Sequence, residues 1–401
     1  MKPFFFLRLL FIGAVSFLTF SCNNEEKKST SDVKEPLTVK TDSVQTSIPD
    51  TIHTKFNQIA RLIAGMDSIP AFLPNLKNRK AFLDLYKSKQ SKFNRIEGLR
   101  LSKLNNWFSD LLKKEKLPDS NFCFYPFAGG DFIHAYYLYP NANEYLLFAL
   151  EPSGSLPNFH NKKEEEILDY LNNLDTVLRD IYLNSYFITK NMNEDIRKKN
   201  MIDGVLPLII WGCSKAGYDI CSIRHFNIDS SGNTVFKNGN EADLGKSKAV
   251  YIEMLKDGQK KSITYLSGDV SDEGLKKNPG LRTFLQKTVP DRKTTTFIKS
   301  ASYLLHHDMF KEMRNFVLNK SSIVIQDDTG VPYRFIDDKI WNIKLFGEYK
   351  PPVKSFSMKL FQNDLDSAYT NKINYAGAIS FSIGYHWNNG YQSQMFYYRK
   401  K

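Results

Sequence analysis

Residues 121–157 read NFCFYPFAGGDFIHAYYLYPNANEYLLFALEPSGSLP. Two apolar runs of strand length, Phe122–Phe127 and Tyr145–Leu150, enclose a glycine-containing loop and a short helix that Asp131 is suited to cap. Two buried strands joined by a helical crossover most simply lie parallel in an open α/β sheet. This segment therefore predicts the core of the fold, with a strand–loop–helix–strand unit at its centre.

Open α/β sheets bind ligands at the carboxyl ends of their strands. The glycines and acidic residues that follow the two expected strands are predicted to line one cleft: Gly129, Gly130, Asp131 and Glu151. A later apolar run, residues 322–326, also ends in two acidic residues, Asp327 and Asp328, which we place at the same cleft.

Apolar periodicity outside this segment predicts further helices and strands. Helices are expected over residues 53–65, 80–112 with a joint at Gly98, 161–187, 272–286, 296–306 and 308–318. Strands are expected over residues 220–228, 250–255, 262–266, 322–326, 378–385 and 394–398. The predicted class is α/β, with mixed α+β as the alternative. It is an open sheet with a parallel core, covering helices and antiparallel hairpins.

The amino-terminal sequence predicts that the protein is exported from the cytoplasm. Lys2 and Arg8 precede the apolar stretch Leu9–Phe20, which is too short for a spanning helix and typical of a signal peptide. The sequence Leu18-Thr19-Phe20-Ser21-Cys22 resembles the lipobox of bacterial lipoproteins, although Thr19 stands where leucine is usual. That resemblance implies a diacylated Cys22 as the mature amino terminus. An ordinary signal peptide or an uncleaved anchor is the alternative.

This interpretation divides the chain into three parts. Residues 1–21 are the expected lipoprotein signal peptide, and residues 22–50 lack aromatic residues and form a flexible tether. Residues 51–401 form one globular α/β domain. The expected location is the bacterial cell envelope, as an outer-membrane lipoprotein on the periplasmic face or the cell surface. The expected partner is the membrane itself, reached through the lipid anchor.

Composition limits the other partners. The 401 residues are 42% hydrophobic, enough for a sizeable core, and the formal net charge is +12. The basic residues are spread along the chain without a dense run, so nucleic-acid binding is not expected. No spacing of His, Cys, Asp and Glu predicts a metal site, and no particular cofactor is indicated. A disulfide between Cys213 and Cys221 stays an open possibility.

The loop Gly129-Gly130-Asp131, with Glu151 after the next strand, resembles the first motif of Rossmann-like methyltransferases. In that family the glycines let a cofactor approach the backbone, and the acid after the second strand holds its ribose. Only two adjacent glycines are present here, and Pro126 lies in the first strand. The alternative is a tight turn beside a structural glutamate.

The segment Gly212-Cys213-Ser214-Lys215-Ala216 resembles the nucleophile elbow of α/β-hydrolases. The resemblance implies Ser214 as nucleophile, with Asp327 or Asp328 and then His386 completing a triad. Gly217 follows within one turn, however, and strand-forming residues come next. We therefore expect residues 207–215 to form a buried helix that Gly217 ends.

Two classes of function remain. The first is a lipid-anchored envelope lipoprotein that presents a ligand-binding or interaction domain for an unknown small molecule or protein. The second is an envelope enzyme, namely a hydrolase that uses Ser214 and His386. A further alternative is a domain with a methyltransferase-like fold. We expect such a domain to lack methyltransferase activity, because the cofactor is not available outside the cytoplasm.

Overall fold

The structure is a computed structural model, and it describes residues 52–66, 73, 79–117, 120–160, 162–186, 202–238, 244, 247–386 and 393–400. The expected signal peptide, Cys22 and the tether lie outside these residues. Within the described ranges, no helix combines the length and the apolar character that a membrane crossing requires.

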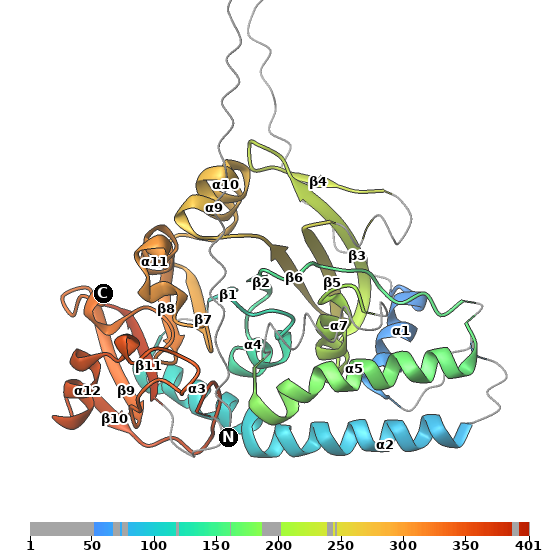
Figure 1. Cartoon of the computed structure of the whole chain (residues 1–401), viewed down its shortest axis with the longest axis horizontal. Helices are drawn as coiled ribbons and strands as arrows, with labels where there is room; N and C mark the ends of the chain where they lie inside the picture. The colour runs from blue at the N-terminus through green and yellow to red at the C-terminus, as the bar shows by residue number, and fades with distance from the viewer. Residues whose placement is uncertain are drawn as a thin grey trace, which may run out of the picture. The chain divides into compact units, whose positions relative to one another are not determined.

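The described strands form one open, mixed sheet (Figure 1). The strands are β1 (Phe122–Pro126), β2 (Glu144–Ala149), β3 (Asp219–Ile228), β4 (Thr234–Phe236), β5 (Ala249–Lys256), β6 (Gln259–Ser267), β7 (Thr294–Ile298), β8 (Ser321–Gln326), β9 (Trp341–Gly347), β10 (Tyr375–Gly377) and β11 (Ser393–Arg399). Their order is β10-β9-β11-β8-β7-β1-β2-β6-β5-β3-β4. The predicted α/β class and open sheet are confirmed.

The centre of this sheet is parallel. β8, β7, β1, β2 and β6 are neighbours that all run in the same direction. β1 and β2 pair from Phe122 opposite Glu144 to Pro126 opposite Phe148, as the opening segment predicts. Antiparallel strands flank this core, with β5, β3 and β4 on one side and β11 inserted between β8 and β9 on the other.

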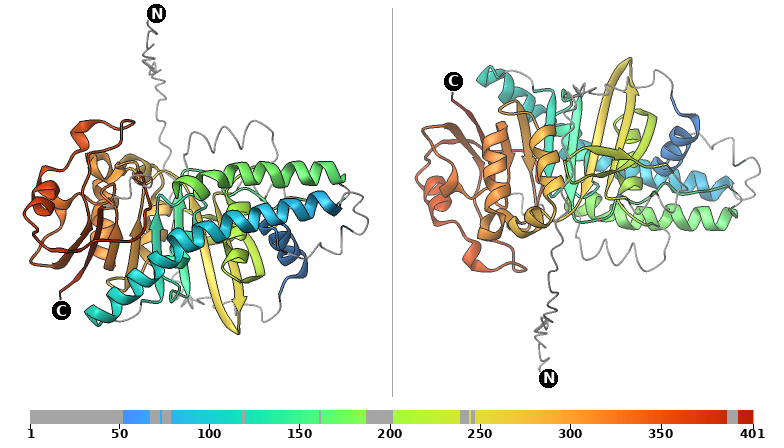
Figure 2. Two further views of the ribbon diagram at one scale, coloured as in Figure 1. Left: turned by 90° about the horizontal axis from the view of Figure 1, so that it is seen from below. Right: turned by 90° about the horizontal axis from the view of Figure 1, so that it is seen from above.

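Helices cover both faces of the sheet (Figure 2). The helices are α1 (Thr54–Ala64), α2 (Arg79–Ile96), α3 (Ser102–Glu115), α4 (Phe132–Leu138), α5 (Glu164–Asn184), α7 (Leu206–Lys215), α9 (Asp272–Lys277), α10 (Pro279–Thr288), α11 (Lys311–Lys320) and α12 (Asn363–Thr370). Short 3-10 turns occupy Leu304–His306, Asp308–Phe310, Tyr333–Phe335 and Met358–Leu360. The long helices α2 and α5 lie side by side on one face.

Alternation along β1 divides the core into two layers, because successive side chains of a strand point to opposite faces. Cys123 and Tyr125 belong to the cluster that includes residues of α1 to α5 and α7. Phe122 and Phe124 belong to the cluster on the other face, with residues of α9, α10, α11 and α12. A strand buried on both faces is what a helix-covered parallel sheet requires.

Two expected elements are wrong. Residues 296–306 are predicted as a helix, but β7 ends at Ile298 and an irregular segment follows. A short apolar run fits a buried strand as well as a buried helix, so periodicity alone cannot separate them. Residues 378–385 are not a strand, because β10 ends at Gly377 and the chain continues as a loop.

Two local predictions on helices are confirmed. A π-helical turn over Glu97–Leu101 joins α2 to α3, at the joint expected near Gly98. α7 runs to Lys215, and Gly217 adopts a left-handed φ of 84° directly after it. The helix therefore ends where the glycine permits a conformation that other residues resist.

Candidate functional site

A cavity of about 440 Å³ lies at the carboxyl ends of β1, β2 and β7. The chain leaves β1 toward α4 on one face, and it leaves β7 toward α11 on the other. In the sheet, β1 lies between β2 and β7. The crossover from β1 and the crossover from β7 pass over opposite faces, so the crossover direction reverses between these two strands. A reversal of this kind opens a crevice beyond the strand ends, which is where α/β proteins hold ligands.

The cavity wall is made of loops from distant parts of the sequence. Its lining residues are Tyr125, Phe127, Ala128, Gly129, Asp131, Ala149, Leu150, Glu151, Tyr186, Lys299, Ser300, Ala301, Ser302, Leu304, Ser355, Phe356 and Tyr385. Three predicted cleft residues, Gly129, Asp131 and Glu151, are therefore brought together. The other three, Gly130, Asp327 and Asp328, are absent from the wall.

The two adjacent glycines have different structural roles. Gly129 lines the cavity with a left-handed φ of 56°, a conformation that glycine adopts at low cost. Gly130 instead allows α4 to approach α7, since an added Cβ would lie 2.8 Å from Cβ of Leu208. Only the first glycine thus shapes the wall directly, while the second fixes the helix behind it.

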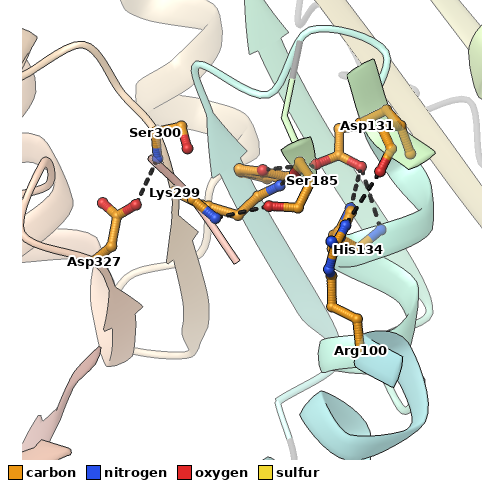
Figure 3. A network of polar contacts seen from close by, with 10 residues as sticks. Arg100, Asp131, His134, Ser185, Lys299, Ser300 and Asp327 are labelled. Atoms are coloured by element: carbon orange, nitrogen blue, oxygen red, sulfur yellow. Dashed lines mark hydrogen bonds and ion pairs between the residues drawn. The ribbon is translucent and has the colours of Figure 1, made fainter. Parts of the chain in front are cut away.

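Asp131 and Lys299 form a buried ion pair at the cavity floor (Figure 3). Nζ of Lys299 lies 2.8 Å from Oδ2 of Asp131, and the lysine also donates to the backbone carbonyl of Ser185. The Tyr125 hydroxyl donates to the same carboxylate oxygen at 3.0 Å, and Nδ1 of His134 lies 2.8 Å from the other oxygen. Asp131 thus combines its predicted helix cap with a charge partner from β7.

Burial and charge act against each other on this pair. Burial would raise the pKa of Asp131, but His134 and Lys299 outweigh burial and hold that pKa below its ordinary value. Burial lowers the pKa of Lys299, and the Asp131 carboxylate limits the decrease. Burial also lowers the pKa of His134 to about 4, so this imidazole is neutral at physiological pH. The ion pair leaves no net charge on the cavity floor.

Arg100 holds the end of α5 beside this floor. Its guanidinium donates to the carbonyls of Ile181 and Leu183 at 3.3 and 3.2 Å. The last carbonyls of a helix lack internal partners and carry partial negative charge, so a cation there is stabilising. Arg100 thereby positions the turn at Ser185 whose carbonyl accepts from Lys299.

The loop after β7 is held in an unusual conformation. Ser300, Ser302 and Tyr303 all have left-handed φ values, at 52°, 52° and 57°. Non-glycine residues adopt this region rarely, and clusters of them persist only where neighbours hold them in place. Ser300 N–H donates to Oδ2 of Asp327 at 2.8 Å, and the Tyr303 hydroxyl donates to Oδ2 of Asp328 at 2.6 Å.

The acidic pair after β8 therefore supports the cavity from behind. Burial raises the pKa of Asp327, and the same effect, with the neighbouring carboxylate, raises the pKa of Asp328 to about 7. Thr329 donates its backbone N–H to Asp327 at 3.0 Å, and Ala301 N–H donates to the Thr329 hydroxyl at 2.8 Å. These contacts lock the loop after β7 onto the loop after β8.

Glu151 stands apart from these networks. It lies two residues after the end of β2 and is only 5% exposed, yet it lines the cavity. Its backbone carbonyl accepts from the Tyr265 hydroxyl at 2.7 Å. Within the described part of the chain, no hydrogen bond or ion pair reaches its carboxylate.

Aromatic rings form the wall on the β7 side. The rings of Tyr186 and Tyr385 are 4.7 Å apart between centroids at an interplanar angle of 83°, and Phe356 lies 4.9 Å from Tyr385. The Tyr385 hydroxyl donates to the carbonyl of Ser300 at 3.0 Å. We refer to Tyr186, Phe356 and Tyr385 as the ring wall. Edge-to-face and tilted rings of this kind suit an apolar or planar ligand group.

Ser214 lies within α7 rather than at a strand-to-helix elbow. Its side chain is buried, and its hydroxyl has no hydrogen-bond partner among the described residues. Both ring nitrogens of the buried His386 are likewise without a partner there. A nucleophilic serine needs an exposed hydroxyl and a bound histidine, so the local geometry gives the hydrolase hypothesis no support.

Sequence reasoning missed the residues that complete the cavity on its β7 side. Lys299 and Ser300 follow the apolar run 294–298, and interpreting that run as the start of a helix hid the strand end. The ring wall had no sequence signal, because its members come from the turn after α5 and from two separate loops. In the described residues no group of three potential ligands forms a metal site, and Cys123, Cys213 and Cys221 are free thiols.

Comparison with known proteins adds no family to this picture. No protein-family model matches the chain, and no curated protein matches it in sequence.

Proposed function

We propose that this protein is a lipid-anchored lipoprotein of the bacterial cell envelope whose globular domain binds a small ligand. The cavity beyond β1, β2 and β7 is the binding site, and its position at the reversal of crossover direction is the observation that carries this proposal. Its volume falls within the range of about 300–1,000 Å³ typical of small-molecule sites. Its mixture of apolar walls and a few buried polar groups is also typical of them.

Binding, rather than catalysis, agrees best with the chemistry of the lining. The Asp131 carboxylate and the Lys299 ammonium are committed to each other, and neither His134 nor Ser214 lines the cavity. A general base or nucleophile must reach the reacting group, so these side chains are poorly placed for such a role. The lipobox resemblance at Cys22 and the tether residues 23–50 support presentation of this domain from a membrane.

A methyltransferase-like domain without its activity is the second candidate. One observation favours it: Gly129 and Glu151, which carry the resemblance, line the same cavity. In this form the Glu151 carboxylate would accept hydrogen bonds from the ribose hydroxyls of a nucleoside.

Native mass spectrometry of the full chain, extracted from its own membranes in mild detergent, tests the proposal. We expect a retained molecule of small mass on the wild-type protein. Leu150 lines the cavity and is 65% exposed, so Leu150→Trp should obstruct the mouth without unfolding the domain, and the retained molecule should be lost. Leu99→Trp is the matched control, since Leu99 is 57% exposed and lies outside the lining.

Ligand retained equally by the Leu150→Trp protein would place the binding site elsewhere. A chain that retains nothing, and whose thermal unfolding no compound of a metabolite collection shifts, would contradict the proposed function itself. Stabilisation by ligand follows mass action, so a ligand at 100 times its Kd stabilises by about 2.7 kcal/mol.

A further inference from the structure

The charged groups that line the cavity do not balance. Asp131 and Lys299 compensate each other at 2.8 Å. Among the described lining residues, this leaves Glu151 as the one carboxylate that no basic side chain accompanies. Within the described part of the chain, the cavity therefore has one carboxylate without a cationic partner, at the end of β2.

This carboxylate is open to a ligand in the cavity. Glu151 is 5% exposed, and its carboxylate receives no hydrogen bond from the part of the chain that the structure describes. Hydrogen bonds between a carboxylate and a cationic donor are stronger than those between neutral groups. A ligand that brought a positive charge would therefore pair with Glu151 best. A hydroxyl group would offer a hydrogen bond but would leave the net charge in place.

The opposite side of the cavity requires a different ligand group. The ring wall lies over the loop after β7, where Tyr385 is fixed by hydrogen bonds to the Ser300 carbonyl and the Ser302 hydroxyl, both at 3.0 Å. Phe127, Leu150 and Leu304 add apolar surface. This side can cover an alkyl or aromatic group, and the Lys299 ammonium beside it is already paired with Asp131.

Strand spacing sets the distance between the two ends. β2 and β7 are the two neighbours of β1, and adjacent strands lie roughly 4.8 Å apart, so their ends are separated by about 10 Å. A ligand that used both ends would carry its charge and its apolar group at about this separation.

We propose that the cavity binds a small amphipathic organic cation, with its ammonium group on Glu151 and its apolar body on the ring wall. This inference rests on the proposed ligand-binding function and specifies the chemistry of the ligand. Glu151 then determines ligand charge, while Tyr186, Phe356 and Tyr385 determine shape. The pair Asp131–Lys299 adds no net charge to the floor between them.

Three probes of one shape test the charge: 6-phenylhexylammonium, 6-phenylhexan-1-ol and 6-phenylhexanoate. Each carries a phenyl ring whose centre lies about 10 Å from its polar group when the chain is extended, as the strand spacing requires. Titration calorimetry with the full chain in detergent should give the ammonium compound at least a tenfold lower Kd than the alcohol. The carboxylate compound should not bind measurably.

Variants assign the preference to one residue. Glu151→Gln should lower the protein's affinity for the ammonium compound to its affinity for the alcohol. Glu144→Gln, at the opposite and exposed end of β2, should leave the preference unchanged. Unfolding of ligand-free protein gives a second measurement: a cooperative thermal transition of Glu151→Gln, at a melting temperature close to that of the wild type, shows that the variant is folded.

Equal affinity for the ammonium compound and the alcohol would overturn the inference, as would a preference that survives Glu151→Gln. A neutral or anionic molecule retained in the native mass spectrum, and absent from Leu150→Trp, would overturn the inference while leaving the proposed function intact. Adenosine binding that depends on Glu151, without ammonium binding, would favour the methyltransferase-like candidate instead. Absence of any ligand would contradict both proposals.

Discussion

At the scale of single residues, the cavity depends on buried charges whose partners come from other strands. Asp131 follows β1 and Lys299 follows β7, and each would be an uncompensated buried charge without the other. Breaking such a pair costs about 3–5 kcal/mol, whereas replacing both partners can cost little. The pair therefore specifies how the two loops meet rather than adding much net stability.

Asp328 provides a pH-dependent test of the loop support. Burial, with Asp327 beside it, raises its pKa to about 7 in the folded protein, whereas an unfolded aspartate titrates near its ordinary value. Between these values the folded state binds the extra proton, so the free energy of unfolding falls as pH rises, by up to about 1.4 kcal/mol per pH unit. Asp328→Asn cannot lose a proton and should flatten this slope.

Urea unfolding at pH 5, 6, 7 and 8 measures the difference. The free energy of unfolding of the wild type minus that of Asp328→Asn should decline from pH 5 to pH 7 and should be constant above pH 7. Asp338→Asn is the control, since Asp338 is exposed and should leave the slope unchanged. Parallel wild-type and Asp328→Asn curves would show that the buried carboxyl does not keep its proton.

At the scale of elements, the approach of α4 to α7 sets the back of the glycine loop. A Cβ on Gly130 would lie 2.8 Å from Cβ of Leu208 and 3.3 Å from Cβ of Val205. Because backbone positions in both segments would have to shift, Gly130→Ala should destabilise the protein by about 1–3 kcal/mol. Chemical denaturation measures this loss.

Gly98→Ala is the matched control. Gly98 lies in the π-helical turn, and an added Cβ meets nothing within 4 Å. Alanine favours helix over glycine by up to about 1 kcal/mol, so this change should be neutral or stabilising. Equal destabilisation by the two changes would refute close packing as the reason for Gly130.

For the molecule as a whole, we predict that an amino-terminal lipid anchor presents the cavity at a membrane. Cys22 follows the apolar leader and precedes the tether, so we predict that it carries the lipid. Cys22→Ala should abolish palmitate labelling and release the protein from membranes, because it removes the residue that would carry the acyl chains. Several acyl chains anchor a protein stably, whereas a single chain anchors it only marginally. Labelling and fractionation of cells measure both effects.

Cys123→Ala serves as the control, because Cys123 is a buried free thiol of β1 and should contribute no label. Unchanged labelling in Cys22→Ala, together with unchanged membrane association, would exclude the lipoprotein interpretation. Release without loss of ligand would show that anchoring and binding are independent properties of the chain.

Local sequence patterns were sufficient to predict several units of the fold. The parallel pair β1–β2, the hairpin β5–β6, the helix α7 and the helix cap at Asp131 were all predictable. Each depends on apolar periodicity, on glycine or on capping chemistry within a few residues. Gly129, Asp131 and Glu151 were predicted at one cleft for the same reason, since one strand–loop–helix–strand unit carries all three.

The residues that face Gly129, Asp131 and Glu151 across the cavity depend on tertiary packing instead. The placement of β7 beside β1 brought Lys299 to Asp131, although these positions are far apart in the chain. Strand order depends on non-local pairing, which no local period encodes, and the run 294–298 is too short to distinguish strand from helix. The ring wall likewise depends on loops that meet through packing. The imbalance of charge at Glu151 therefore became visible only when its neighbours in space were known.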